Sequence, residues 1–188
     1  CALLGLGIAH YRSDDNKTSL QYLNELDNTE SGFETQKLNY FLAENYFATN
    51  DFKEAINRYN NVNGKDVDLN LQALYGKAYS YFNSGDYENA AYQFLDFTKK
   101  YPKDKRFTDA RLRLADSYFG SKNYSASSKV YQELFTSDSR LSIDPNIRYQ
   151  YAQTLYKSGK TDDAITEFKN IQEKFPNSEY AEVSLYTI

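Results

Sequence analysis

The sequence predicts an all-α fold, a solenoid of about five helix–turn–helix repeats followed by part of a sixth. Three observations lead to this prediction. Short polar turn segments recur every 35 to 37 residues, small residues stand at fixed distances on both sides of each turn, and large apolar residues follow at helical spacing. The chain of 188 residues also has only three Pro and eight Gly, which favours long helices joined by short turns.

The turn segments divide the chain into helix pairs. Glycine, asparagine and aspartate suit such turns, because one residue needs a positive φ and the next helix needs a cap at its N-terminus. The five segments are SDDN (13–16), TNDF (49–52), SGDY (84–87), SKNY (121–124) and SGKT (158–161).

The small residues mark where the two helices of each pair cross. Helices packed at the usual interaxial distance of about 8–10 Å need small side chains at their closest approach. The residues before the turns are Gly7, Ala43, Ala78, Ala115 and Ala152, and those after the turns are Ser19, Ala55, Ala90, Ser127 and Ala164.

Large residues are expected to fill the core where the helices diverge. Tyr101-Pro102 and Phe175-Pro176 are expected to end the second helices of their repeats, since proline cannot continue a helix. The expected core positions are Leu23, Tyr59, Phe94, Tyr131 and Phe168, and then Leu26, Val62, Phe97, Leu134 and Ile171.

This spacing of small and aromatic residues resembles the tetratricopeptide repeat, and the resemblance covers essentially the whole chain. The clearest copy is ALYGKAYSYFNSGDYENAAYQF at 73–94. The resemblance implies a right-handed α-α superhelix. We expect one solenoid over 1–188, with repeats at about 1–34, 36–68, 71–105, 107–143 and 145–178 and a partial repeat at 179–188.

The exits YPKD and FPNS give the repeat a 37-residue variant form. This variant resembles the repeats of bacterial envelope proteins, such as the periplasmic coordinator of the Tol–Pal system and the outer-membrane-assembly lipoprotein. The resemblance favours a periplasmic or outer-membrane-associated location.

Both ends of the sequence look like the inside of a helix. The segment NSEYAEVSLYTI at 177–188 has the pattern of the first helix of a sixth repeat. We therefore expect a fragment of a longer solenoid with apolar, uncapped ends. Such ends could pair as a dimer.

The family resemblance implies that the first helix of each pair lines a concave groove for a protein or peptide partner. Tyrosine offers a large contact area with few rotors and a polar tip, which suits an interface. The expected groove residues are Tyr40, Glu44, Tyr75, Tyr79, Phe82, Leu112, Asp116, Tyr149, Gln153 and Tyr156. In the alternative interpretation the last residue of each groove set only packs against the preceding helix; these residues are Tyr11, Phe47, Phe82, Phe119 and Tyr156.

A basic segment, TKKYPKDKRFTDARLR at 98–113, interrupts the acidic sequence. One interpretation is a docking patch for an acidic partner or a phosphate surface. The other is a solvated turn whose cations lie near a helix C-terminus, where they complement its dipole. The patch residues are Lys99, Lys100, Lys103, Lys105 and Arg106.

The sequence gives no indication of catalysis, a metal or a cofactor. The lone cysteine is Cys1, and the lone histidine, His10, takes a helix-packing position. Glu44 and Asp116 lie two repeats apart, about 20 Å if each groove helix is about 10 Å wide. That separation exceeds the roughly 5–9.5 Å between the carboxylates of a glycosidase.

The net charge and the length of the apolar runs exclude further classes of protein. The net charge of −4 argues against a nucleic-acid binder. No apolar run approaches the ~18 residues of a membrane span. The leading hypothesis is a non-catalytic scaffold in a bacterial envelope assembly; the alternatives are a module that binds glycans or cell-wall fragments and a cytoplasmic regulatory sensor.

Overall fold

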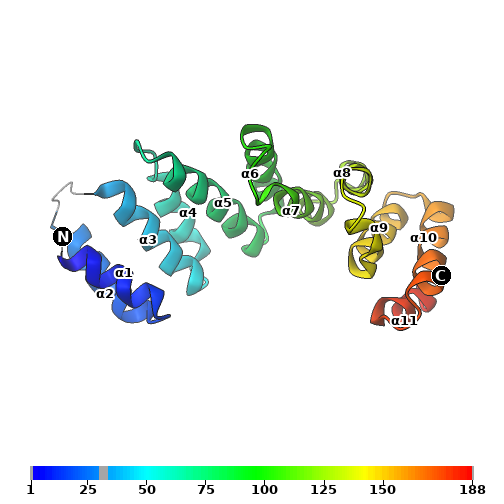
Figure 1. Ribbon diagram of the computed structural model, residues 1–188, viewed down its shortest axis with the longest axis horizontal. Helices are drawn as coiled ribbons and strands as arrows, with labels where there is room; N and C mark the ends of the chain where they lie inside the picture. Colours follow the sequence, from blue (N-terminus) through cyan, green and yellow to red (C-terminus); the bar gives the residue numbers. More distant parts are fainter. Residues whose placement is uncertain (1, 30–33, 188) are drawn as a thin grey trace. The chain divides into compact units, whose positions relative to one another are not determined.

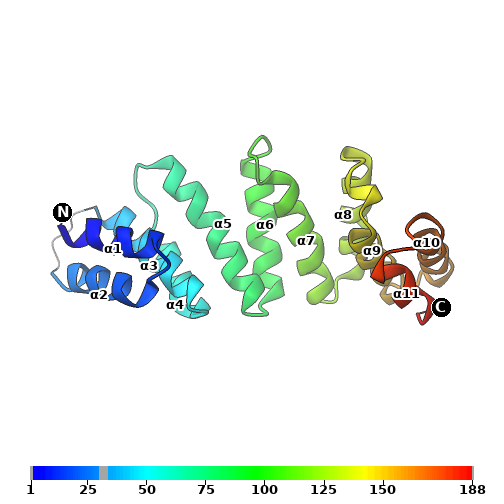
Figure 2. The same cartoon turned by 60° about the horizontal axis from the view of Figure 1, so that its bottom comes forward.

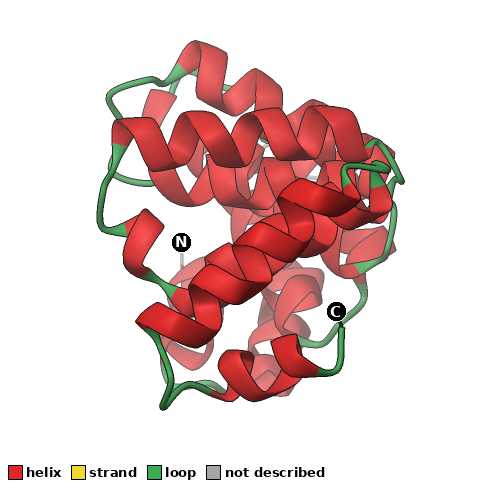
Figure 3. Ribbon diagram, turned by 90° about the vertical axis from the view of Figure 1, so that its right-hand side faces the viewer, coloured by secondary structure: helices red, strands yellow, loops and turns green. Residues whose placement is uncertain are grey.

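A computed structural model describes residues 2–29 and 34–187. Within these ranges the secondary structure is helical, and no strand occurs (Figures 1 and 3). The α-helices are α1 (Ala2–Arg12), α2 (Asn16–Asp27), α3 (Thr35–Ala48), α4 (Phe52–Asn60), α5 (Val67–Asn83), α6 (Tyr87–Lys100), α7 (Phe107–Gly120), α8 (Tyr124–Ser137), α9 (Pro145–Lys157), α10 (Thr161–Lys174) and α11 (Glu179–Leu185), and a 3₁₀ helix, η1 (Leu141–Ile143), precedes α9.

The chain divides into two compact units, residues 1–93 and 94–188, and α6 runs across the boundary between them. In the first unit α1 packs on α2 and α3 on α4, and α2 and α4 each also contact the next helix along the chain (Figure 2). The second unit repeats this order with α7 on α8, α9 on α10, and α11 against α10. The all-α helix–turn–helix architecture is confirmed.

The turns follow one geometry in all five repeats. The second residue of each turn segment has a positive φ, at Asp14, Asn50, Gly85, Lys122 and Gly159. The third residue precedes the next helix, and in four turns its side chain accepts a hydrogen bond from the helix backbone. The four capping residues are Asp15, Asp51, Asp86 and Asn123. Lys160, in the fifth turn, makes no such bond.

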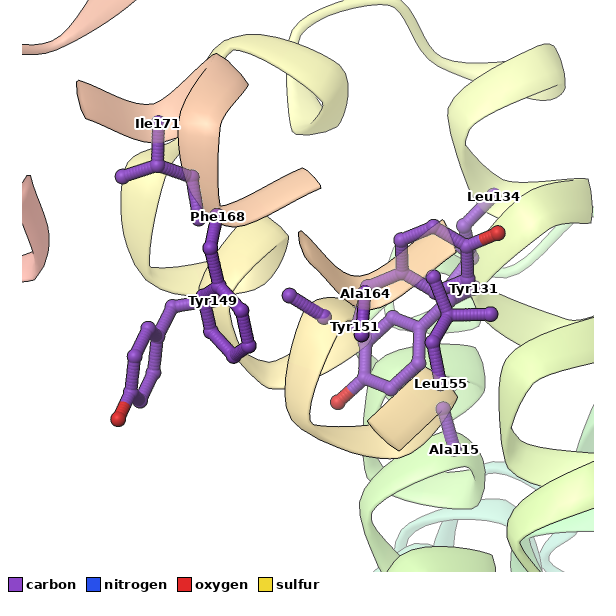
Figure 4. Close-up of a cluster of buried hydrophobic side chains, with 10 residues drawn as sticks. Ala115, Tyr131, Leu134, Tyr149, Tyr151, Leu155, Ala164, Phe168 and Ile171 are labelled. Carbon is purple, nitrogen blue, oxygen red and sulfur yellow. The ribbon is translucent and has the colours of Figure 1, made fainter. Parts of the chain in front are cut away.

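The predicted core is confirmed position by position. All ten small residues at the helix crossings are buried, and so are the ten large residues that follow them. In the second unit Tyr131, Leu134, Phe168 and Ile171 join one cluster with residues of α9 (Figure 4). Two of the small residues do more than fill space, because the hydroxyls of Ser19 and Ser127 donate to the carbonyls of Gly7 and Ala115 across the crossing.

The structure has two features that the repeat pattern did not predict. Helix α5 begins at Val67, ahead of the expected repeat boundary at 71, because the carboxylate of Asp66 accepts from the amide of Leu69 and starts the helix there. Between α8 and α9 the chain forms η1, where the side chain of Arg148 donates to the carbonyl of Ser142.

Candidate functional site

The expected groove residues of the first unit form a row of half-buried aromatic side chains on α3 and α5, two helices in contact. The rings of Tyr75 and Tyr79 meet edge to face, with centroids 5.1 Å apart. The hydroxyl of Tyr40 donates to Oε1 of Gln72 at 3.0 Å, which ties α3 to α5. We call Tyr40, Tyr75 and Tyr79 the tyrosine row.

The aromatic residue near the end of each first helix has a packing role in three repeats. Each ring meets the ring five residues later, at the start of the second helix, in an edge-to-face contact of 5.4 to 5.7 Å between centroids. The pairs are Phe47–Phe52, Phe82–Tyr87 and Phe119–Tyr124. In the fifth repeat the residue at the later position is Thr161, and Tyr156 remains 49% exposed.

Glu44 acts as an acceptor for two tyrosine hydroxyls. Its Oε2 accepts from Tyr11 at 2.8 Å, and its Oε1 accepts from Tyr59 at 2.6 Å. Burial raises the pKa of Tyr59 well above its ordinary value, and the negative charge of Glu44 raises it further. The donor therefore stays protonated, and Glu44 joins the first repeat to the second.

Asp116 is the counterpart of Glu44 in the second unit, and its partners Tyr131 and Arg113 belong to the same repeat. It accepts a hydrogen bond from the hydroxyl of Tyr131, and its Oδ2 lies 2.7 Å from Nη1 of Arg113. Burial raises the pKa of Asp116 above its ordinary value, although both partners favour the ionised form. The carboxylate of Asp116 is therefore engaged mainly in contacts within the protein.

The two carboxylates follow a rule within the repeats. A tyrosine at the first large core position of the second helix is matched by an acid directly after the small residue of the first helix, and leucine or phenylalanine is matched by a non-acid. The five pairs are Ile8 and Leu23, Glu44 and Tyr59, Tyr79 and Phe94, Asp116 and Tyr131, and Gln153 and Phe168. The alignment of the repeats contained this pairing of an acid with a core tyrosine. The prediction that Glu44 and Asp116 line the groove did not take it into account.

The expected groove residues of the second unit differ in how deeply they are buried. Tyr149 is only 9% exposed, and its ring lies against that of Phe168, 5.6 Å between centroids (Figure 4). The ring of Tyr180 lies 5.5 Å from it on the same measure. Leu112 packs against the same cluster, and Gln153 is half-buried. Tyr149 therefore serves the core more than the surface.

The basic segment is partly neutralised by acids within it and beside it. Nζ of Lys100 lies 2.8 Å from Asp96, and Nε of Arg106 lies 2.8 Å from Asp104. The hydrogen bond from Arg106 lowers the pKa of Asp104 to about 2. The remaining lysines of the patch, at 99, 103 and 105, are exposed, as expected for a solvated turn as well as for a docking patch.

The expected packing role of His10 fits its surroundings. Its ring stacks on Tyr22 at 5.5 Å between centroids, and its Nδ1 lies 3.1 Å from Oδ2 of Asp15. Cys1 lies outside the described residues. Among residues 2–29 and 34–187, no group of three or more metal-ligating side chains could hold an ion. None of the helices described is long and apolar enough to cross a membrane.

Comparisons with known proteins agree with the repeat pattern. Two tetratricopeptide repeat models match residues 40–105 and 148–178, together somewhat more than half of the chain. No curated protein matches the sequence.

Solved structures share the fold at low sequence identity. MamA AMB-1 is 13% identical with a TM-score of 0.74, over 98% of this chain and 95% of its own. MamA from Desulfovibrio magneticus RS-1 is 15% identical with a TM-score of 0.72, over 95% and 96%. A structure of nearly identical TPR-like repeats from Podosopora anserina is 13% identical with a TM-score of 0.68, over 94% and 96%. These similarities show the α-α superhelix fold.

Proposed function

Since the chain belongs to the tetratricopeptide repeat family, we propose that it is a non-catalytic scaffold that binds a protein or a peptide segment through the aromatic surface of its first helices. The observation that carries this proposal is the tyrosine row of the first unit. Its side chains place half-buried aromatic rings on two helices that are in contact. Tyrosine in this setting contributes contact area and hydrogen bonding at a low entropic cost.

The hydrogen bonds of the two groove acids support an aromatic rather than an acidic binding surface. Glu44 and Asp116 are engaged with tyrosines of the core, so we expect the partner to bind the aromatic rings rather than the carboxylates. This also weakens the glycan alternative, in which aromatic faces stack on sugar rings while Glu44, Asp116 and Gln153 bond the sugar hydroxyls. We place the scaffold in a bacterial envelope assembly on the strength of the Tyr-Pro and Phe-Pro exits.

The proposal is tested with a peptide selected against the whole chain from a random library and measured by calorimetry. The double variant Tyr75→Ala, Tyr79→Ala should weaken binding by about 30-fold or more, as expected for hot-spot aromatics worth about 2 kcal/mol. Tyr92, on α6 and 66% exposed, gives the matched control Tyr92→Ala, which should bind normally. Unchanged binding in the double variant would contradict the assignment of the surface.

We further propose that the chain associates through its apolar ends. Leu6 on α1 and Val183, Leu185 and Tyr186 at the end of α11 are exposed hydrophobic side chains. Isolated exposed hydrophobics are ordinary, but a helical face that carries several of them is typical of an interaction site.

A further inference from the structure

The side chain of Gln36 on α3 holds the connection between α4 and α5. Its Nε2 donates to the carbonyl of Asp66 at 2.8 Å and to Oδ1 of Asn70 at 2.7 Å, and its Oε1 accepts from the amide of Asp66 at 3.1 Å. The side chain of Asn70 in turn donates to the carbonyl of Gly64 at 2.9 Å. We call these four residues the glutamine clamp.

The clamp leaves no room for a side chain at position 64. A Cβ atom there would lie 2.7 Å from Cδ of Gln36, closer than such atoms approach in proteins. The packing of the clamp thus accounts for a glycine directly after Asn63, and these two residues are the single Asn-Gly pair of the sequence. Because glycine has no Cβ, its backbone nitrogen is the least hindered of any residue.

Asn63 itself lies just outside the clamp. It is exposed and belongs to no helix. Among residues 2–29 and 34–187, neither its side chain nor the amide of Gly64 takes part in a hydrogen bond. The chain is held on both sides of it, because Val62 is buried in the core and the carbonyl of Gly64 bonds to Asn70.

Other asparagines in turns and at helix ends differ in the amide that follows them. That amide donates a hydrogen bond to a backbone carbonyl earlier in the chain. Its nitrogen would have to give up this bond before it could attack the preceding side chain. Examples are the pairs Asn28-Thr29, Asn50-Asp51, Asn61-Val62, Asn83-Ser84 and Asn177-Ser178.

We infer that Asn63 is a site of spontaneous deamidation in the folded chain, and that its isoaspartyl product breaks the glutamine clamp. Hydroxide removes the amide proton of Gly64, and the nitrogen attacks Cγ of Asn63. The side-chain nitrogen takes a proton from water and leaves as ammonia, which regenerates hydroxide and closes a cyclic imide. Water then opens the imide at either carbonyl and gives aspartate or isoaspartate.

The isoaspartyl form lengthens the backbone. The chain then runs through the side chain of residue 63, which adds a methylene between Val62 and Gly64. The extra length has to displace one of these neighbours, and the exposed Gly64 moves at a lower cost than the buried Val62. The start of α5, which Asp66 caps, should therefore loosen. The inference goes beyond the proposed binding function and does not depend on it.

The site is tested on the folded 188-residue chain, kept at mildly alkaline pH and followed by peptide mapping with mass spectrometry. Asn63 should convert to a mixture of aspartate and isoaspartate, at a rate that rises with pH. Asn63→Gln should remain intact, because its longer side chain closes a larger ring more slowly.

Ser84→Gly gives a matched Asn-Gly pair at 83–84, where the amide of residue 84 donates to the carbonyl of Ser80 at 3.0 Å. In the folded chain of this variant, Asn83 should react about tenfold more slowly than Asn63, since a bonded helix end worth about 1.4 kcal/mol has to open first. In urea the two sites should react at equal rates. An Asn63 that persists in the folded chain, or that reacts no faster than Asn83 in this variant, would overturn the site.

The effect on the clamp is tested on the aged chain, which is separated from the unmodified chain by its added charge. Amide hydrogen exchange at the start of α5 should be about fivefold faster in the isoaspartyl chain, as expected for the loss of a hydrogen bond. Freshly prepared Asn63→Asp carries the same charge on a normal backbone and should exchange as the wild type does. Equal exchange in the isoaspartyl and Asn63→Asp chains would overturn the proposed break of the clamp.

Discussion

At the scale of single residues, the unusual feature is the pair of buried tyrosines whose hydroxyls bond carboxylates. Tyr59 and Tyr131 are almost fully buried, and each donates to a carboxylate of the paired helix. A buried hydroxyl without a partner is costly, so the acid and the tyrosine have to occur together. The fifth repeat satisfies the same packing with Gln153 and Phe168 and needs no such bond.

We predict that Tyr131→Phe destabilises the chain by about 1–3 kcal/mol, because Asp116 loses a donor while it stays largely buried. The double variant Asp116→Gln, Tyr131→Phe installs the pair of the fifth repeat and should recover part of that loss. Urea unfolding of Tyr131→Phe, Asp116→Gln and the double variant gives the coupling free energy, expected at about 0.5–3 kcal/mol. Tyr92→Phe, at an exposed tyrosine, is the control, and equal losses in the single and double variants would contradict the prediction.

The pH dependence of stability should carry the signature of Asp116. Burial raises its pKa in the folded state above the usual 3.8, so the folded chain binds this proton more tightly than the unfolded chain. The contribution of Asp116 to stability is therefore fully present below pH 3.8 and is lost as the pH rises through the folded pKa. Relative to wild type, Asp116→Asn should gain stability as the pH rises from about 4 to 7. A difference that does not change with pH would contradict the assignment.

At the scale of elements, the turns combine a fixed backbone with variable side chains. The same positive φ is taken by glycine in two turns and by aspartate, asparagine or lysine in the others. Lysine is the residue least suited to it, because its Cβ crowds the backbone and its side chain makes no local turn bond. The fourth turn is therefore expected to have the most strained backbone of the five, because lysine occupies its positive-φ position.

We predict that Lys122→Gly stabilises the chain by about 1 kcal/mol, since glycine adopts the φ of 63° found there without steric conflict. Gly159→Ala, at the equivalent position, should destabilise it by a similar amount. Thermal unfolding of both variants measures the two effects. Changes of the same sign in the two variants would show that φ is not the controlling factor.

The start of α10 lacks a cap that the other second helices have. Lys160 has φ −87° and ψ 61°, close to the φ −84° and ψ 63° of Asn123, which caps α8. Lys160→Asn should therefore place an acceptor at the first amides of α10 and stabilise the chain by about 1 kcal/mol. Lys169→Asn, an exposed position inside the same helix, is the control for the loss of a lysine and should give no gain in urea unfolding. A gain at both positions would point to charge rather than capping.

At the scale of the whole molecule, structural features that recur in every repeat could be predicted from the sequence, and features that occur once could not. The ten small and ten large core positions, and the positive φ of the turns, repeat in every copy and could be predicted. The early start of α5 depends on the single residue Asp66, and η1 depends on the side chain of Arg148. Neither feature recurs, so the periodic pattern could not predict it. The surface was predicted only in part, because whether an acid such as Glu44 faces a partner or a buried tyrosine depends on the opposite helix.

Contacts between neighbouring repeats in the first unit are few and polar as well as apolar. Tyr11 of α1 bonds Glu44 of α3, and Asp27 of α2 pairs with Arg58 of α4 at 2.9 Å. In a chain of repeats, stability is approximately a sum of repeat and nearest-neighbour terms. A change at one such contact should therefore loosen the repeats that share it and leave distant helices unaffected.

We predict that Tyr11→Phe frees α1 and α2 to open locally. The lost hydrogen bond is worth about 1 kcal/mol, which should speed amide hydrogen exchange in those helices by about fivefold. Exchange in α9 and α10, which belong to the other unit, should not change, and Tyr92→Phe should leave both regions as they are. Exchange that accelerated equally in α1 and α10 would mean that the chain unfolds as one cooperative body, and the nearest-neighbour account of its stability would then be wrong.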